Sequence, residues 1–334
     1  MSLGEQAQTA VAAPELEWAL PKRPTILETG LRFVRRKPLG AFGLLLVVLI
    51  IAMTIGTPTG DVGVPSLPAS PLGFELGKPW VARYDAEQFF THSDSGRLVQ
   101  YAGLSWEHWL GTDQQGRDNW SRIVWGSRRS LFVGLWALAF ATMVGTAVGV
   151  VSGYFRGWLD SIMQRFMDAL QSFPPLVALI LIITVNPLSD QPSLTVAAFA
   201  LGFVGITSVQ RIVRGVVLST REQPYVEAAR VIGAGNIRTM VFHILPNIAA
   251  PIIVVFSIGL GAVILAEAAL AFLVPQYVPQ GPSWGLMLNQ GRFVMLDHPG
   301  PALVSSAAIA LAVLGFNLAG DALRDVLDPR LRVG

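Results

Sequence analysis

The side chains that could perform acid–base, metal or nucleophilic chemistry are few and widely separated. The chain of 334 residues contains no cysteine, and its four histidines, at positions 92, 108, 243 and 298, do not form the i, i+4 pair that a helical zinc site needs. It also lacks the GxSxG sequence of a nucleophile elbow. These patterns exclude thiol chemistry and favour no catalytic residue and no metal site.

The lysines also exclude one way of using ATP. A Walker A loop needs a lysine followed by serine or threonine after a glycine-rich turn. Of the three lysines, only Lys78 follows a glycine, and it precedes Pro79. If this protein works with ATP, we expect another polypeptide to bind the nucleotide and its magnesium ion, with no cofactor in this chain.

Three polar residues remain as candidates because they fall inside or beside apolar segments. Asp168 and Glu267 lie near opposite ends of predicted spans, and Asn317 lies near the end of the last one. Charge at membrane depth is costly, so such side chains face protein or water. Each could line a transport pathway or be a structural group satisfied by its neighbours. No chain of acidic and basic groups crosses the middle of the predicted membrane region, which argues against a proton-coupled carrier.

The elements that must position these residues are membrane-spanning helices. The chain is 52% hydrophobic and only 14% charged, against about 25% charged residues in soluble domains. About 20 apolar residues cross the ~30 Å hydrocarbon core as a helix. The sequence predicts an all-α polytopic membrane protein with six spans, at 39–57, 130–153, 162–184, 192–212, 247–273 and 301–320.

The distribution of Lys and Arg predicts that both termini are cytoplasmic. Most of the 24 basic residues lie in the N-terminal tail 1–38, the loop 213–246, the tail 321–334 and the adjoining span ends.

Residues 25–37 are amphipathic and could form an interfacial helix or a basic flank that only fixes topology. Residues 58–129 become an extracytoplasmic loop, which could dock an external partner or cap the helix ends. We expect 115–129 to form a helix on the outer surface. The segment 130–320 is the predicted core transmembrane domain.

Two local patterns predict details of helix packing. Gly145, Gly149 and Gly153 recur every four residues, so they share one helix face and allow a neighbouring helix to approach closely. Pro174 and Pro175 interrupt the span 162–184, so we expect a kink or partial break there.

The loop 213–246 is the most patterned polar stretch between spans. Residues 225–232 are predicted to form a short helix with Tyr225, Ala228, Ala229 and Ile232 on one face, and the glycines after it end that helix. Residues 237–245 restart a helix before Pro246. A short helix with a small, alanine-lined face suits insertion into a cleft on another protein. The alternative is a helical hairpin that lies on the membrane.

Several separated segments resemble one family. Residues 227–233 and 244–246 are similar to the EAA signature of permease subunits of bacterial ABC importers. The dipeptide/oligopeptide/nickel group of C-type permeases is matched by four segments: 110–118 (LGTDQQGRD), 225–230 (YVEAAR), 282–285 (PSWG) and 316–331 (FNLAGDALRDVLDPRL). The chain differs from the family after Leu273, where a glycine-rich turn is replaced by VPQY.

The resemblance implies the partners and the site. The chain would pair with a homologous B-type permease, two ATP-binding subunits and an extracytoplasmic substrate-binding protein, in the lipid bilayer of a bacterial or archaeal cytoplasmic membrane. Nucleic acid is not an expected partner. Coupling to the ATP-binding subunit is assigned to Tyr225, Glu227, Ala228, Ala229, Gly233, Ile244, Leu245 and Pro246.

The resemblance also sets the expected activity and its alternatives. The importer would carry di- or oligopeptides by alternating access, and the chain itself would not be an enzyme. Nickel chelates, glutathione-like molecules and oligosaccharides are alternative substrates. A stand-alone secondary carrier, a membrane enzyme and a membrane anchor or receptor are alternatives from other classes.

Overall fold

The computed structural model describes residues 34–35, 37–55, 81–92, 96–185, 193–279 and 281–327, apart from the side chain of Tyr277. The chain divides into two units, Met1–Pro38 and Leu39–Gly334, and the description below concerns the second. The predicted interfacial helix 25–37, the first part of the outer loop and the end of the C-terminal tail lie almost wholly outside the described residues.

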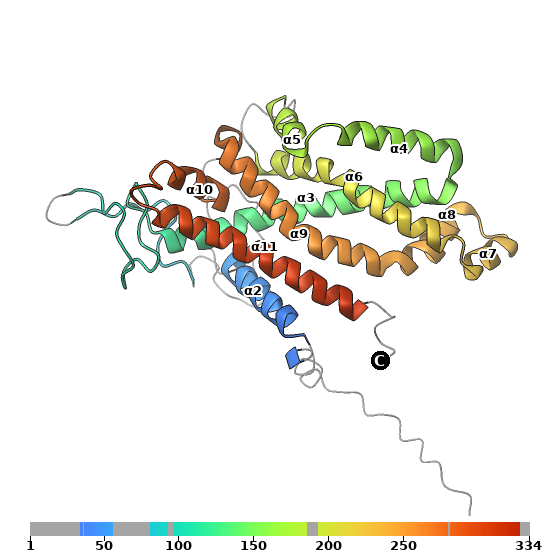
Figure 1. Cartoon of the computed structure of the whole chain (residues 1–334), viewed down its shortest axis with the longest axis horizontal. Helices are drawn as coiled ribbons and strands as arrows, with labels where there is room; N and C mark the ends of the chain where they lie inside the picture. Colours follow the sequence, from blue (N-terminus) through green and yellow to red (C-terminus); the bar gives the residue numbers. More distant parts are fainter. Residues whose placement is uncertain are drawn as a thin grey trace, which may run out of the picture. The chain divides into compact units, whose positions relative to one another are not determined.

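The described part of the chain is helical, with only isolated β-bridges in the outer segment. The helices, shown in Figure 1, are α2 (Pro38–Ile55), α3 (Asn119–Phe155), α4 (Gly157–Gln171), α5 (Pro175–Thr184), α6 (Leu194–Thr220), α7 (Pro224–Val231), α8 (Asn236–Arg238), α9 (Ala249–Leu273), α10 (Trp284–Arg292) and α11 (Gly300–Leu327). A π-helical turn (Thr239–Ile244) and a 3-10 turn (Leu245–Ile248) join α8 to α9, and a second 3-10 turn (Pro275–Tyr277) follows α9.

Within the described residues, five helical segments are long and apolar enough to cross a membrane, and α4 with α5 makes a sixth if this bent pair counts as one span. The all-α membrane fold is therefore confirmed. The break between α4 and α5 is also confirmed: the two helices meet at 85° around Ser172–Pro174. Proline cannot donate a backbone hydrogen bond to the preceding turn, which explains why the helix stops there.

The glycine spacing on α3 has the predicted packing role. An added Cβ at Gly145, Gly149 or Gly153 would lie 2.8–2.9 Å from a valine Cβ of α6. The facing valines are Val209, Val213 and Val217, which repeat at the same interval of four. The missing side chains on α3 therefore let α6 approach to backbone contact distance, and α3 with α6 forms the most extensive helix pair in the described part of the chain.

The expected helix at 115–129 is confirmed only in part: residues 119–129 are helical, but they do not form a separate surface helix. The structure instead has one continuous helix from Asn119 to Phe155, about 55 Å long at 1.5 Å per residue. Asp118 caps its first turn by accepting a hydrogen bond from the Ser121 N–H. The indole N–H groups of Trp120 and Trp125 donate to the carbonyl oxygens of Val81 and Tyr84, so the outer segment covers this end of α3.

Candidate functional site

The loop that follows α6 is short, because α6 remains helical to Thr220. Three residues later α7 begins at Pro224, and it ends before Gly233, whose φ of +89° is strained for residues with a side chain. The N–H groups of Gly233 and Ala234 bond back to the carbonyls of Arg230 and Ala229, which closes the helix end. The chain then returns through α8 and the two irregular turns into α9. These elements form a helical hairpin whose tip is the turn at Gly233.

Buried apolar side chains attach this hairpin to the ends of α3 and α6. Val226 of α7 and Ile244 of the π-helical turn are fully buried, and both belong to one cluster with Val217 and Tyr154. The hairpin is therefore packed against the helix bundle through buried side chains, in addition to its covalent connections to α6 and α9.

Tyr154, in the last turn of α3, makes polar contacts with three parts of the loop. Its hydroxyl donates to the Asn236 side-chain oxygen at 2.9 Å. The Arg230 guanidinium lies 5.0 Å from the centre of its ring, within the range of a cation–π contact. Its carbonyl oxygen accepts a hydrogen bond from Arg221. Movement of α7 or α8 would therefore act directly on α3.

The hairpin exposes bulky apolar side chains on both sides of its glycine turn. Val231 and Ile232 are 81% and 84% exposed, and Ile237 and Phe242 are 75% and 70% exposed. Exposed large apolar side chains in a segment between spans are typical of interaction sites. Partial burial raises the pKa of the Tyr225 hydroxyl above its usual value.

The structure divides the predicted coupling residues into two groups. Tyr225, Glu227, Ala228, Gly233 and Pro246 are exposed, whereas Ala229 and Ile244 are buried and Leu245 is half-buried. Ala229 therefore does not share an exposed face with Tyr225 and Ala228. It packs toward the bundle, where it helps to hold α7.

The predicted coupling set omitted four exposed apolar side chains: Val231, Ile232, Ile237 and Phe242. The available signal was their type, because they are large apolar residues in a polar loop. The EAA pattern does not include these exposed side chains. Some of its residues shape the hairpin, and others project from it.

At the other end of α3, the segment 110–118 forms a second polar arrangement. Gly111 and Gly116 both have φ of +71°, so glycine fits the two turns of this segment. The Asp113 carboxylate accepts hydrogen bonds from the N–H groups of Gln115 and Arg117 at 2.8 and 3.0 Å. Asp118 then begins α3. The conspicuous spacing of this motif is explained by a turn followed by a helix cap.

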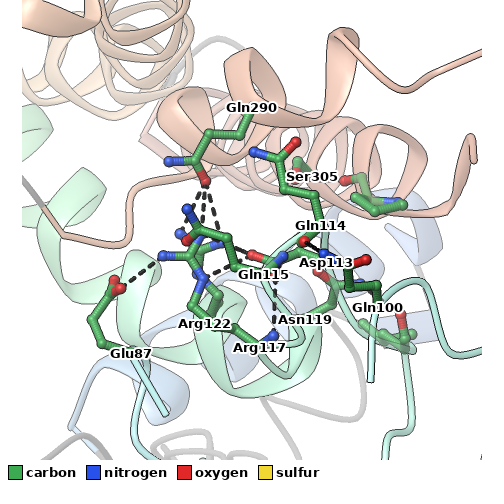
Figure 2. A network of polar contacts seen from close by, with 12 residues as sticks. Glu87, Gln100, Asp113, Gln114, Gln115, Arg117, Asn119, Arg122, Gln290 and Ser305 are labelled. Atoms are coloured by element: carbon green, nitrogen blue, oxygen red, sulfur yellow. Dashed lines mark hydrogen bonds and ion pairs between the residues drawn. The ribbon is translucent and has the colours of Figure 1, made fainter. Parts of the chain in front are cut away.

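The same motif connects the outer segment to α10, as Figure 2 shows. Arg117 bonds Asp113 and also Glu87, at 2.7 Å from the latter. The Gln290 side-chain oxygen on α10 accepts from Arg117 at 3.1 Å and from Arg122 at 3.2 Å. The sequence pattern did not mark Glu87, Arg122 or Gln290, because all three lie outside the motif, and Gln290 is 173 positions from Arg117.

The three candidate membrane residues have separate neighbours, and the structure does not join them in one site. Asp168 of α4 pairs with Arg211 of α6 at 3.0 Å on an exposed surface. Glu267 of α9 is buried and accepts a hydrogen bond from Ser130 at 2.9 Å. Asn317 of α11 lies against Gly261 of α9, where an added Cβ would be 2.8 Å from the amide oxygen.

A cavity of about 770 Å³ opens among α3, α6, α9 and α11. Its wall is mostly apolar and includes Leu138, Ser208, Ile212, Val254 and Ile258. Helix α11 contributes Arg324 to this wall. Sites for small molecules commonly have about 300–1,000 Å³ of space. The cavity is therefore large enough for a molecule of the size of a short peptide.

Similarity to known proteins identifies the family of this chain. Residues 145–333, more than half of the chain, match the family described as binding-protein-dependent transport system inner membrane component. The chain is 41% identical over 242 residues to the dipeptide transport system permease protein DppC of Alkalihalophilus pseudofirmus, covering 72% of this chain and 78% of that protein.

Two further relatives are glutathione transport system permease proteins named GsiD. The protein from Pectobacterium atrosepticum is 40% identical over 75% of this chain and 80% of its own length. The protein from Escherichia coli O157:H7 is 37% identical over 76% of this chain and 80% of its own length. The chain therefore belongs to the family of inner membrane components of binding-protein-dependent transport systems.

Proposed function

We propose that this chain is a permease subunit of an ABC importer for dipeptides or glutathione-like short peptides. As the inner membrane component of such a system it forms the membrane pathway, and ATP binds to separate ATPase subunits. The substrate proposal rests on relatives at 37–41% identity whose names state dipeptide or glutathione transport. Their two substrates are both short peptides, and this shared class is the one that we assign.

The proposed assembly contains one copy of this chain, a homologous B-type permease, two ATP-binding subunits and an extracytoplasmic binding protein. The hairpin at 221–248 would lie on the cytoplasmic side and enter a cleft of one ATP-binding subunit. The observation that carries this role is the exposure of Val231, Ile232, Ile237 and Phe242 on a hairpin whose inner face is packed against α3 and α6. Such an element offers an apolar contact outside and a rigid connection inside.

The cavity among α3, α6, α9 and α11 would be this chain's half of the translocation pathway. Closure of the ATP-binding subunits would push on the hairpin, and the hairpin would turn α3 and α6 through the Tyr154 contacts and the cluster around Val217. The pathway would then open alternately to the two sides of the membrane.

Purified transporter in proteoliposomes tests the coupling role. Replacing Ile232 by glutamate should abolish most of the ATPase stimulation by the liganded binding protein, because a charge cannot enter an apolar cleft without a large desolvation cost. The conservative Ile232→Leu variant should keep it. Full stimulation in Ile232→Glu, with normal assembly, would contradict the proposed role of this surface.

The substrate class is tested in the same vesicles by ATP-driven uptake of radiolabelled dialanine and glutathione. We expect at least one of the two to be taken up with the binding protein present, and neither without ATP. Absence of uptake of both peptides by an assembled, ATP-hydrolysing transporter would overturn the assignment to short peptides.

A further inference from the structure

The wall of the cavity among α3, α6, α9 and α11 carries a single charge among the described residues. The charged residue is Arg324 of α11, and the one other described wall residue with a polar side chain is Ser208 of α6. No acidic residue of the described chain lines this cavity. An apolar wall with one positive charge suits a ligand that has an apolar body and an anionic end.

The packing of α11 on α9 explains why Arg324 reaches this wall. An added Cβ at Gly261 would lie 2.8 Å from the Asn317 amide oxygen, and an added Cβ at Gly320 would lie 2.8 Å from the Ile258 side chain. The two helices are therefore antiparallel at this contact. Arg324 lies one turn after Gly320 on the same face of α11, since helical residues four apart are neighbours. This brings it level with the turn of α9 that precedes Ile258.

Arg324 lies at one end of the cavity. It is three residues before the end of α11, and Leu327, the last residue of that helix, also lines the wall. The wall extends from there to Leu138, which lies near the middle of α3. In the proposed orientation, the end with Arg324 is the cytoplasmic one. A peptide that leaves the pathway would therefore pass this residue.

The Arg324 guanidinium is available to a ligand. The residue is exposed, and no hydrogen bond or ion pair with another described residue engages its side chain. Its acidic neighbours in α11, Asp321 and Asp325, are not part of the wall. By contrast, Arg214 of α6 makes a bidentate pair with Asp160 at 2.7 and 2.6 Å. Arg324 can therefore bind a carboxylate without breaking a pair within the described chain.

We propose that Arg324 binds the α-carboxylate of a short peptide in this cavity, while the peptide's apolar side chains contact the wall formed by α6 and α9. Arginine suits this role because its planar guanidinium can donate two parallel hydrogen bonds to one carboxylate. The described wall offers no carboxylate to the peptide's ammonium group, so binding requires a free C-terminus and not a free N-terminus. This inference rests on the proposed function as a peptide importer, and it adds the residue that selects the anionic end of the substrate.

Cysteine protection in the complete transporter tests this inference, since the chain has no native cysteine. The transporter is assembled in lipid nanodiscs without the binding protein, so that added peptides meet only the membrane pathway. A cysteine at Ser208 should react with a water-soluble methanethiosulfonate reagent, and dialanine should slow this reaction several-fold. Labelling is measured on this subunit after electrophoresis. N-acetyl-dialanine should protect the cysteine as well as dialanine does, whereas dialanine amide, which has no carboxylate, should not protect it.

Variants of this chain test the charge of Arg324 itself. Arg324→Gln should raise the dialanine concentration for half-protection by about tenfold or more, the range expected of a hydrogen bond to a charged group. Arg324→Lys keeps the charge and should retain protection. Arg165→Gln is the matched control and should also retain it, because Arg165 is exposed, has no partner within the described chain and does not line the cavity. A cysteine at Glu107, in the outer segment, should react at a rate that dialanine does not change.

Several results would overturn the inference. An unreactive cysteine at 208 in the assembled transporter would mean that another subunit or lipid fills this cavity. Equal protection by dialanine and its amide, or protection that survives Arg324→Gln, would mean that the guanidinium does not bind the carboxylate. Absence of protection by dialanine would mean that the peptide does not bind in the cavity. ATP-driven uptake of dialanine and glutathione by the unsubstituted transporter with its binding protein is measured in parallel, so failure of the proposed substrate class is distinguished from failure of this site.

Discussion

At the scale of single residues, Tyr154 is one point where the hairpin at 221–248, the proposed coupling element, contacts the membrane helices. Its hydroxyl, ring and carbonyl oxygen each contact a different part of the segment 221–236. Because one residue contacts three parts of the loop, movement of any of these parts would act on the helix that carries this residue. In this chain that helix is α3, which reaches from the hairpin to the outer segment.

Tyr154 variants should therefore separate coupling from folding. Tyr154→Phe removes the hydrogen bond to Asn236 and should cost about 1 kcal/mol in stability. Tyr154→Ala also removes the ring under Arg230 and should lower the ratio of transported substrate to hydrolysed ATP several-fold. Uptake and ATPase rates in proteoliposomes measure this ratio, and thermal unfolding in detergent reports stability. An unchanged ratio in Tyr154→Ala would contradict the role of this contact.

At this scale, the sequence predicted the roles of only some residues. The motif 110–118 could be recognised by its resemblance to a family, but the turn at Asp113 and the helix cap at Asp118 were not predicted, because the expected helix at 115–129 included Asp118. The contact of Arg122 with Gln290 depends on how α3 and α10 pack, so no local pattern could predict it.

At the scale of elements, the sequence predicted the helices whose ends coincide with the ends of apolar runs. The first predicted span, 39–57, corresponds to Pro38–Ile55, and the last, 301–320, lies within Gly300–Leu327. The start of α3 was not predicted, because its first eleven residues include Arg122, Arg128 and Arg129, which lower the hydropathy of that segment. Their burial in the folded chain is a tertiary effect that a search for apolar runs cannot detect.

The contact between α3 and α6 gives a prediction at this scale. Gly149→Ala should destabilise the protein by about 1–3 kcal/mol, because the new Cβ would lie 2.9 Å from both the Gln210 carbonyl oxygen and the Val213 Cβ. Gly215→Ala is the matched control, since an added Cβ there meets no atom within 4 Å. The measurement is the midpoint of thermal unfolding in detergent.

Equal midpoints for the two alanine variants would contradict the close packing of α3 on α6. Gly149→Ala should also affect the ratio of transported substrate to hydrolysed ATP less than it affects the midpoint of thermal unfolding. The added Cβ widens the α3–α6 pair and does not contact the hairpin.

At the scale of the whole molecule, the hairpin and the outer segment contact opposite ends of α3. Tyr154 is at its C-terminal end, and Ile123 near its N-terminal end accepts a hydrogen bond from Trp284 of α10. Figure 1 shows α7 and α10 at opposite ends of the helices of this unit. A single long helix thus connects the proposed ATPase contact with the face on which a binding protein would deliver substrate.

The proposed orientation can be tested by labelling introduced cysteines in intact cells. A cysteine at Glu107, which is exposed in the outer segment, should react with a membrane-impermeant maleimide. A cysteine at Ser219, near the end of α6, should react only after the cells are permeabilised. The reverse pattern would show that the hairpin is on the outer side, where no ATP-binding subunit could reach it.

The most direct test of the central claim is a disulfide cross-link between the hairpin and the ATP-binding subunit. A cysteine at Ile232, which is 84% exposed, would be combined in turn with cysteines along the cleft of that subunit in the assembled transporter. We predict a cross-link at one cleft position whose yield changes when ATP is bound. No cross-link at any cleft position, in a transporter that assembles and hydrolyses ATP, would contradict the role of the hairpin as the coupling element.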